Sequence, residues 1–255
     1  MLPWTMHCRS MRPPVLEAIR EGWRLRRAWW FTATARTRAR FARTVLGSFW
    51  LGLSNVLSIG VLGVVYGTVF KVEDFSHYIV YLGTGMVCWG MIASSISSAP
   101  GILEGNARQI LGGVRLFNQK EVIAVLAIFK PLILLNLLVA GLIPLINLLL
   151  FCYWAPLLIC ILGARFKDLY QLIPILLQLV FLLSPILYQK HTLGALQWIA
   201  EVNPLYLVLN QVRHALIDGR LSAARDLGLF ILNLLGTSAA LASLQKERYK
   251  LPFLF

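Results

Sequence analysis

Long apolar stretches separated by short polar ones dominate the chain from residue 47 onward. A helix needs about 20 mostly apolar residues to cross a membrane. Stretches of about this length predict spans at residues 47–70, 78–100, 122–143, 145–163, 171–188 and 226–244. The pattern therefore predicts an all-α integral membrane protein with six transmembrane helices.

Two segments have a helical pattern but are too polar to cross. In residues 15–30, apolar residues recur at helical spacing and arginines gather on another face. This predicts a basic amphipathic helix in the headgroup region, with an ordinary surface helix as the alternative. Residues 189–224 contain two short amphipathic segments separated by Asn203-Pro204. They predict a re-entrant outer loop between spans five and six, and a folded external loop is the alternative.

The third and fourth spans have little room between them. Val122 to Gly163 is 42 residues, and two crossings need about 40. We therefore expect a tight hairpin with its tip near residues 144–147, where Pro144 would break the helix.

The positions of the charges set the expected orientation. Only 14% of residues are charged and the net charge is +13, whereas soluble domains carry about 25% charged residues. Eighteen Lys and Arg residues fall on the side of the N-terminal arm, and five fall on the opposite side. Basic residues favour the cytoplasm, which places both termini there. The same distribution argues against nucleic-acid binding.

The sequence "ARFKDLYQ" interrupts two of the most apolar stretches. Arg165, Lys167 and Asp168 place three charges within four residues. On this topology they form a cytoplasmic turn at the inner interface. Arg165 and Asp168, three residues apart, would pair if the turn is helical.

The chemistry of catalysis is sparse in this sequence. There is no GxxxxGK[ST] phosphate loop and no GxGxxG motif. The acidic residues lie in arms, loops or span ends, and the four cysteines and four histidines show no metal-ligand spacing. We therefore predict neither a catalytic site nor a cofactor or metal site in this chain.

Three residues are candidates for a substrate path. Lys130 lies within the third apolar stretch, so it either faces a pathway or extends to the inner surface. Trp89 and Tyr81 are eight residues apart and share one helix face. Their rings could stack on sugars, although packing within the bundle is the alternative for Trp89.

Four stretches, in order, resemble one family. They are "RTRARFARTVLGSFW", "YIVYLGTGMVCWG", "GARFKDLYQLIPILLQLVFLLSPILY" and "AEVNPLYLVLNQVRHALIDG". Together they are similar to type-2 ABC exporter permeases, in the subgroup that exports polysaccharides such as O-antigen, capsule or teichoic acid. The resemblance covers roughly residues 25–240. It implies a cytoplasmic or interfacial arm at 1–46, a transmembrane domain at 47–245 and a cytoplasmic tail at 246–255.

The resemblance also implies partners and a cargo. Two permease copies would surround a channel in the plasma (inner) membrane, and two separate ABC ATPase subunits would bind ATP. The loop after the second span, including Glu104 and Arg108, would dock on the ATPase. The cargo would be a lipid-linked polysaccharide, as in lipopolysaccharide biosynthesis. Four arginines at the inner leaflet could bind its phosphates or act only as topology signals: Arg36, Arg38, Arg40 and Arg43.

The sequence departs from the family pattern in two places. The stretch before "RFKD" is shorter by perhaps 20 residues, and Leu135-Asn136 stands where the family favours His-Asn. Two alternatives therefore stay open. One is a type-2 permease for another cargo, such as a drug or a lipid. The other is a degenerate membrane scaffold that no longer transports.

Overall fold

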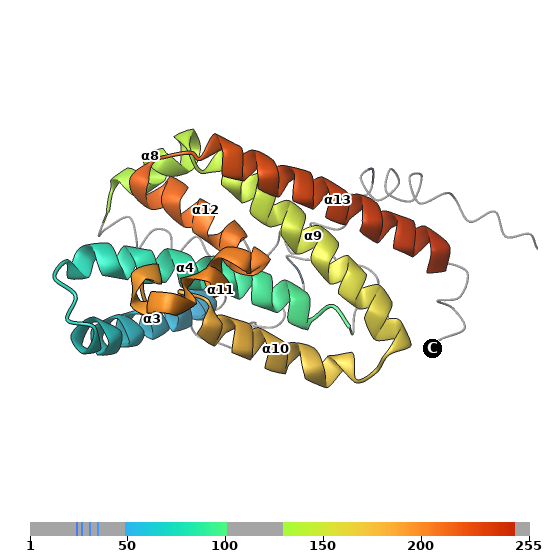
Figure 1. Ribbon diagram of the computed structural model, residues 1–255, viewed down its shortest axis with the longest axis horizontal. Coiled ribbons are helices and arrows are strands. Elements are labelled where there is room, and N and C mark those ends of the chain that lie inside the picture. The colour runs from blue at the N-terminus through green and yellow to red at the C-terminus, as the bar shows by residue number, and fades with distance from the viewer. Residues whose placement is uncertain are drawn as a thin grey trace, which may run out of the picture.

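The computed structural model describes residues 24, 27, 31, 35, 49–100 and 130–247. Within these residues the fold is entirely helical, as predicted. Four helices are long and apolar enough to cross a membrane: α3 (Phe49–Val69), α4 (Phe75–Ser97), α9 (Leu142–Arg165) and α13 (Ala223–Glu247). They match the first, second, fourth and sixth predicted spans. Figure 1 shows them as an elongated bundle.

The other elements are shorter. They are α8 (Leu132–Val139), α10 (Leu169–Leu183), the 3₁₀ helix η2 (Lys190–Leu196), α11 (Gln197–Val202) and α12 (Pro204–Asp218). The predicted third span lies only partly within the described residues. The predicted fifth span is helical only to Leu183, so residues 184–188 leave the helix. In the N-terminal arm, Arg24, Arg27, Phe31 and Ala35 are helical and exposed.

The helices have a consistent direction in the bundle. α9 and α13 run parallel, because Asn147 contacts the start of α13 and Leu157 and Ile161 cluster with Ala240. α10 runs antiparallel to α4. The Tyr170 hydroxyl, at the start of α10, donates to the Pro100 carbonyl just after α4, and the Pro185 carbonyl after α10 accepts from Tyr81 near the start of α4. The 165–168 turn therefore shares one end of the bundle with the C-terminal ends of α4 and α13 (Figure 1).

The predicted hairpin tip near Pro144–Asn147 is wrong. α8 ends at Val139 and α9 begins at Leu142, so the chain bends at Ala140–Gly141. The backbone N–H groups of both bend residues donate to the Asn136 carbonyl, at 2.9 and 2.8 Å. Pro144 lies in the first turn of α9, where a missing N–H breaks no helical hydrogen bond.

The ion pair expected for a helical 165–168 turn does not form, and residues 166–168 are not helical. Arg165 and Asp168 form no ion pair; the Arg165 guanidinium instead lies over the Phe166 ring, 5.7 Å from its centroid. The turn is short and hydrogen-bonded, with the N–H of Tyr170 donating to the Lys167 carbonyl. Arg165 ends α9 and the chain extends at Phe166, whereas Asp168 directly precedes α10.

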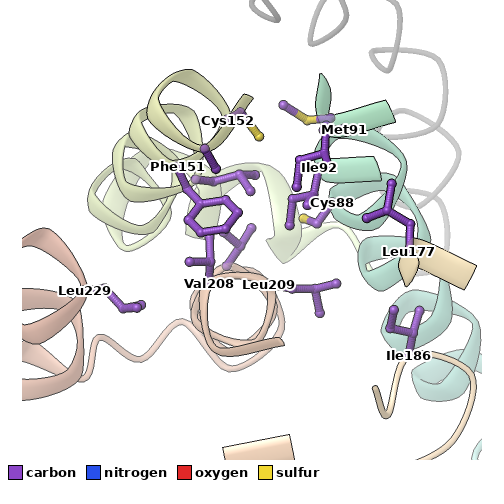
Figure 2. Packing of buried hydrophobic residues seen from close by; sticks show 14 of the residues in the cluster. Cys88, Met91, Ile92, Phe151, Cys152, Leu177, Ile186, Val208, Leu209 and Leu229 are labelled. Carbon is purple, nitrogen blue, oxygen red and sulfur yellow. The ribbon is translucent and has the colours of Figure 1, made fainter. Parts of the chain in front are cut away.

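The largest apolar cluster lies where five helices meet. Figure 2 shows side chains from α4, α9 and α12 converging at its centre, with α10 and α13 at its edges. The labelled residues include Ile92, Phe151 and Leu209, which are almost fully buried. Burying such side chains away from water stabilises soluble proteins strongly. In a membrane, close packing replaces that force, so tight contact in this cluster holds the bundle.

Candidate functional site

The backbone between α10 and η2 is the most unusual part of the bundle. Residues 184–188 are not helical, yet they lie against the first turns of α4. Ser184, Ile186 and Leu187 are buried. Backbone carbonyls at membrane depth must find donors in the protein, because lipid offers none.

Two tyrosines of α4 supply some of the donors for the carbonyls of residues 184–188. The Tyr78 hydroxyl donates to the Leu187 carbonyl. The Tyr81 hydroxyl lies 3.1 Å from the Pro185 carbonyl and 3.2 Å from that of Tyr188. Tyr78 and Tyr81 are three residues apart, so one helix face presents both hydroxyls to the same segment.

Arg213 of α12 supplies the remaining donors. Its side chain is 2% exposed. Nη1 donates to the Pro185 carbonyl at 3.0 Å, and Nη2 donates to that of Ile186 at 3.4 Å. The guanidinium also stacks 3.6 Å from the centre of the Tyr81 ring. We call residues Tyr78, Tyr81 and Arg213 with segment 184–188 the carbonyl clamp.

The electrostatics of the clamp are unusual. None of the ion pairs found in the described part of the chain involves Arg213, and its Nε atom has no hydrogen-bond partner there. Buried charges normally pair with an opposite charge. Here carbonyl dipoles and the negative face of an aromatic ring compensate the cation instead. Gly85, one turn after Tyr81, leaves the space that the guanidinium occupies.

α12 lies inside the bundle and is fixed at both of its ends. At its start, the Asn203 side chain accepts from the N–H of Leu205 at 3.1 Å and Pro204 occupies the first turn. Asn203-Pro204, predicted to separate two amphipathic segments, thus begins the second of them as a capped helix. The helix buries more than apolar side chains, because Gln211 and Arg213 are buried as well.

At its C-terminal end, α12 is held by residues before and within α8. Lys130 donates to the Ile217 carbonyl, and the Asn136 amide donates to that of Leu216 at 2.9 Å. Gly219 ends the helix with φ of 63°, a conformation that favours glycine. A cation at a helix C-terminus is favourable because the last carbonyls are unpaired.

Lys130 was predicted to face a pathway or to extend to the inner surface, and its ammonium instead caps α12. This end of α12 packs beside the start of α4, away from the 165–168 turn. Extension to the surface that carries that turn is therefore wrong. Whether Lys130 also contacts a substrate stays a prediction.

Tyr81 and Trp89 both lie on α4, and both rings are in contact with protein. Trp89 packs against Phe181 of α10, with ring centroids 5.5 Å apart. Tyr81 lies beneath Arg213. The packing alternative thus describes Trp89 in this structure, and the role of the pair in sugar stacking stays a prediction.

Several other predicted residues occupy the bundle ends or fall outside the description. Lys167 and Asp168 are exposed in the turn. Arg36, Arg38, Arg40, Arg43, Glu104 and Arg108 lie outside the described residues. At the surface near α11, Lys190 donates to Glu201, and this hydrogen bond lowers the pKa of the Glu201 carboxyl.

Arg213 is one of the five basic residues assigned from the sequence to the side opposite the N-terminal arm, and the structure buries it. A signal was present, because Arg213 follows Leu209 by one turn and so lies on the apolar side of its helix.

A second polar cluster joins α9 to α13 and was also missed. Asn233 donates to the Asn147 carbonyl at 3.0 Å and accepts from the Trp154 indole N–H at 2.9 Å. Asn147 in turn donates to the Asp226 carbonyl at 3.1 Å. Single asparagines within apolar spans often join helices in membranes, so Asn147 and Asn233 could have been singled out by that rule.

Comparison with known proteins agrees with this architecture. The family described as ABC-2 type transporter matches residues 117–217, which include α8 to α12. The O-antigen export system permease protein RfbA of Klebsiella pneumoniae is 24% identical over 234 residues, covering 84% of this chain and 89% of the relative. Both matches include the 165–168 turn and the segment that the clamp holds. These findings confirm the predicted resemblance of this chain to type-2 ABC transporter permeases, with a relative in the polysaccharide-export subgroup.

Proposed function

We propose that this chain is the permease subunit of an ABC transporter that exports a lipid-linked polysaccharide across the plasma membrane. The observation that carries the proposal is the match to an O-antigen export permease along most of both chains. Four candidate spans in one bundle agree with a multi-pass membrane subunit. ATP hydrolysis would occur on partner ABC ATPase subunits, as is general for permeases of this family.

Two copies of the chain would enclose the path, and both termini would be cytoplasmic. The arrangement would have the six spans predicted from the sequence, of which four candidates lie within the described residues. The α10 helix with η2, α11 and α12 would then form a fifth span followed by a re-entrant segment on the outer side. The clamp supports this arrangement, because it satisfies non-helical backbone inside the bundle.

A complementation experiment tests the proposal. A strain lacking this gene should accumulate lipid-linked polymer inside the cell, and the wild-type chain should restore surface polysaccharide. Inactivating the ATP-binding lysine of the partner ATPase should abolish the restoration. Normal surface polysaccharide without this chain would contradict the cargo and would favour a drug or lipid exporter. Restoration that survives loss of ATP hydrolysis would favour the alternative of a scaffold.

The ATPase contact is proposed at residues 101–121. Glu104 and Arg108 would form part of a docking segment, and reversing both charges should uncouple ATP hydrolysis from export while the protein stays in the membrane. Export at the wild-type rate in that double variant would remove this segment from the mechanism.

The four arginines before the first span are proposed to bind the diphosphate of the lipid carrier. Guanidinium binds phosphate with two parallel hydrogen bonds, whereas lysine offers a single point charge. Replacing Arg36, Arg38, Arg40 and Arg43 by lysine keeps the topology signal and removes this geometry. Export should fall in the fourfold variant. Normal export would leave these residues with a topological role alone.

A further inference from the structure

The exposed side of α10 is divided into two flanks of different character. One flank is a leucine stripe at helical spacing, and the other bears two glutamines seven residues apart. The leucine flank consists of Leu172, Leu176, Leu179 and Leu183; the glutamine flank contains Gln171, Pro174 and Gln178, and the exposed Ile175 and Leu182 lie between the two flanks. At 100° per residue, Gln171 and Gln178 lie about 20° apart around the helix axis. α10 packs on the bundle through its third side, where Ile173 and Leu177 are buried.

Gln178 differs from the other polar side chains on exposed helix faces. The hydroxyls of Ser58, Thr68 and Ser238 donate to carbonyls of their own helices. Such bonds allow a polar side chain to face lipid at little cost. Gln178 is exposed in the interior of α10 and makes no hydrogen bond within the described residues. A free amide has two N–H donors and one acceptor oxygen, and leaving them unpaired in an apolar medium is costly.

The other long helices provide a comparison. Within the described spans, the exposed residues in the interior of α9 are apolar: Leu142, Ile143, Ile146, Leu149 and Leu162. The exposed face of α13 is similar, with Leu227, Ile231 and Leu235. Faces of this kind suit lipid tails. The leucine flank of α10 is apolar in the same way and suits lipid, whereas the glutamine flank carries polar amides.

The short length of α10 and the segment that follows it also favour a position beside a polar path. With 15 residues it is about 22 Å long, which is less than the roughly 30 Å of hydrocarbon in a bilayer. It is followed directly by the segment that the carbonyl clamp holds. A helix that stops within the bundle and continues as non-helical backbone is typical of a helix beside a polar path.

We propose that the glutamine flank of α10 contacts the cargo, with the Gln178 amide forming hydrogen bonds to hydroxyl groups of the passing polymer. This inference rests on the proposed export function and names the residues that contact the cargo. An amide suits a hydroxyl-rich chain because it both donates and accepts and carries no charge that would hold the polymer too tightly. The aromatic rings of Tyr81 and Trp89, by contrast, already have protein partners.

Thiol labelling tests the surroundings of this flank without any knowledge of the sugar. Gln178→Cys and Leu179→Cys are made one at a time in a chain whose four native cysteines are replaced, and each is expressed in membranes with the partner ATPase. Both positions are exposed and lie at the same depth, so Leu179→Cys is the matched control. A small water-soluble methanethiosulfonate reagent should modify position 178 about tenfold faster, because the reactive thiolate forms where water reaches it.

Equal rates at the two positions, with and without Mg·ATP, would overturn the proposal, since the glutamine flank would then be no more accessible to water than the leucine flank. Both measurements use labelled, membrane-inserted protein, so a variant that fails to insert is recognised before its rate is compared.

Export gives a second, separate readout. Gln178→Leu should lower the rate of surface polysaccharide appearance about fivefold, the equivalent of one net hydrogen bond, while Gln178→Asn should retain most of it. Wild-type export in Gln178→Leu would contradict the contact while leaving the export function intact. Failure of the wild-type chain to restore export would contradict the proposed function itself, so the two outcomes are distinguishable.

Discussion

Arg213 shows how a single charge can be kept inside an apolar bundle without a carboxylate. Its N–H groups reach two backbone carbonyls and its planar face rests on Tyr81. Arginine suits this position because its guanidinium stays charged, is planar and donates in fixed directions. Lysine could not stack and donate in the same way. The residue therefore links α12 to the backbone after α10 and to α4 at one point.

Replacing Tyr81 by phenylalanine should separate the two contributions of that side chain. The ring beneath Arg213 stays, while the hydroxyl that donates to the carbonyls of Pro185 and Tyr188 is lost. We expect a loss of about 1–3 kcal/mol, because buried carbonyls lose a donor. Tyr153→Phe is the control, since Tyr153 is half-buried and has no hydrogen bond among the described residues. Thermal unfolding in detergent measures both, and equal midpoints would contradict the clamp.

Adding one methyl group at Gly85 should disturb the same site from the other side. A Cβ there would lie 3.1 Å from the Arg213 Cζ atom and closer still to Nη2. The guanidinium could move away only by giving up its bonds to the 184–188 carbonyls. Gly85→Ala should therefore cost about 1–3 kcal/mol. Gly60→Ala should be near neutral, because nothing lies within 4 Å of that position. The same unfolding assay compares the two, and a neutral Gly85→Ala would mean that Arg213 is not fixed.

At the scale of elements, α9 and α13 are joined along much of their length by polar and close contacts. Asn147, Asn233 and Trp154 form a chain of hydrogen bonds between them. About one turn after Asn233, the indole of Trp154 lies directly over Gly236. Hydrogen bonds between helices and small residues that allow close approach are the two main means of helix association in membranes. This pair uses both.

Gly236→Ala should loosen this pair, whereas Gly228→Ala should not. A Cβ at position 236 would lie 2.5 Å from two atoms of the Trp154 ring, and one at position 228 would meet nothing within 4 Å. Both glycines belong to α13, so the intrinsic gain in helix propensity is shared. The expected difference is about 1–3 kcal/mol, measured by thermal unfolding of the purified chain. Equal stability of the two variants would show that α13 can shift away from Trp154 at no cost.

At the scale of the whole molecule, the bundle has two distinct ends. One carries the 165–168 turn with the ends of α4 and α13, and the other carries the α3–α4 loop and the residues that follow α12. The exposed helix faces between them are largely apolar. A bundle of this kind fits a bilayer with its two ends in water, and the charge distribution then decides which end is cytoplasmic.

Labelling from outside tests this orientation. In a cysteine-free background, Lys167→Cys should be protected from an impermeant maleimide in intact cells, and Arg220→Cys should react. Both positions are exposed in the structure, so lack of reaction at position 167 would reflect its side of the membrane. Reaction at position 167 in intact cells would invert the proposed topology and would favour the degenerate-permease alternative.

The sequence by itself determined where the four long helices of the described residues are, since hydrophobic length is a local property and a span must be apolar along its whole length. It also determined the start of α12, because an Asn cap followed by Pro acts through its immediate neighbours. The position of the bend before α9 was missed, because Pro144 disrupts nothing in a first turn and only the folded backbone shows that Asn136 receives both bend N–H groups. Tertiary structure alone decided the roles of Arg213, Lys130 and the two asparagines. Each bonds a group more than 25 residues away in sequence, and the spacing of residues along a chain carries no information about such distant partners.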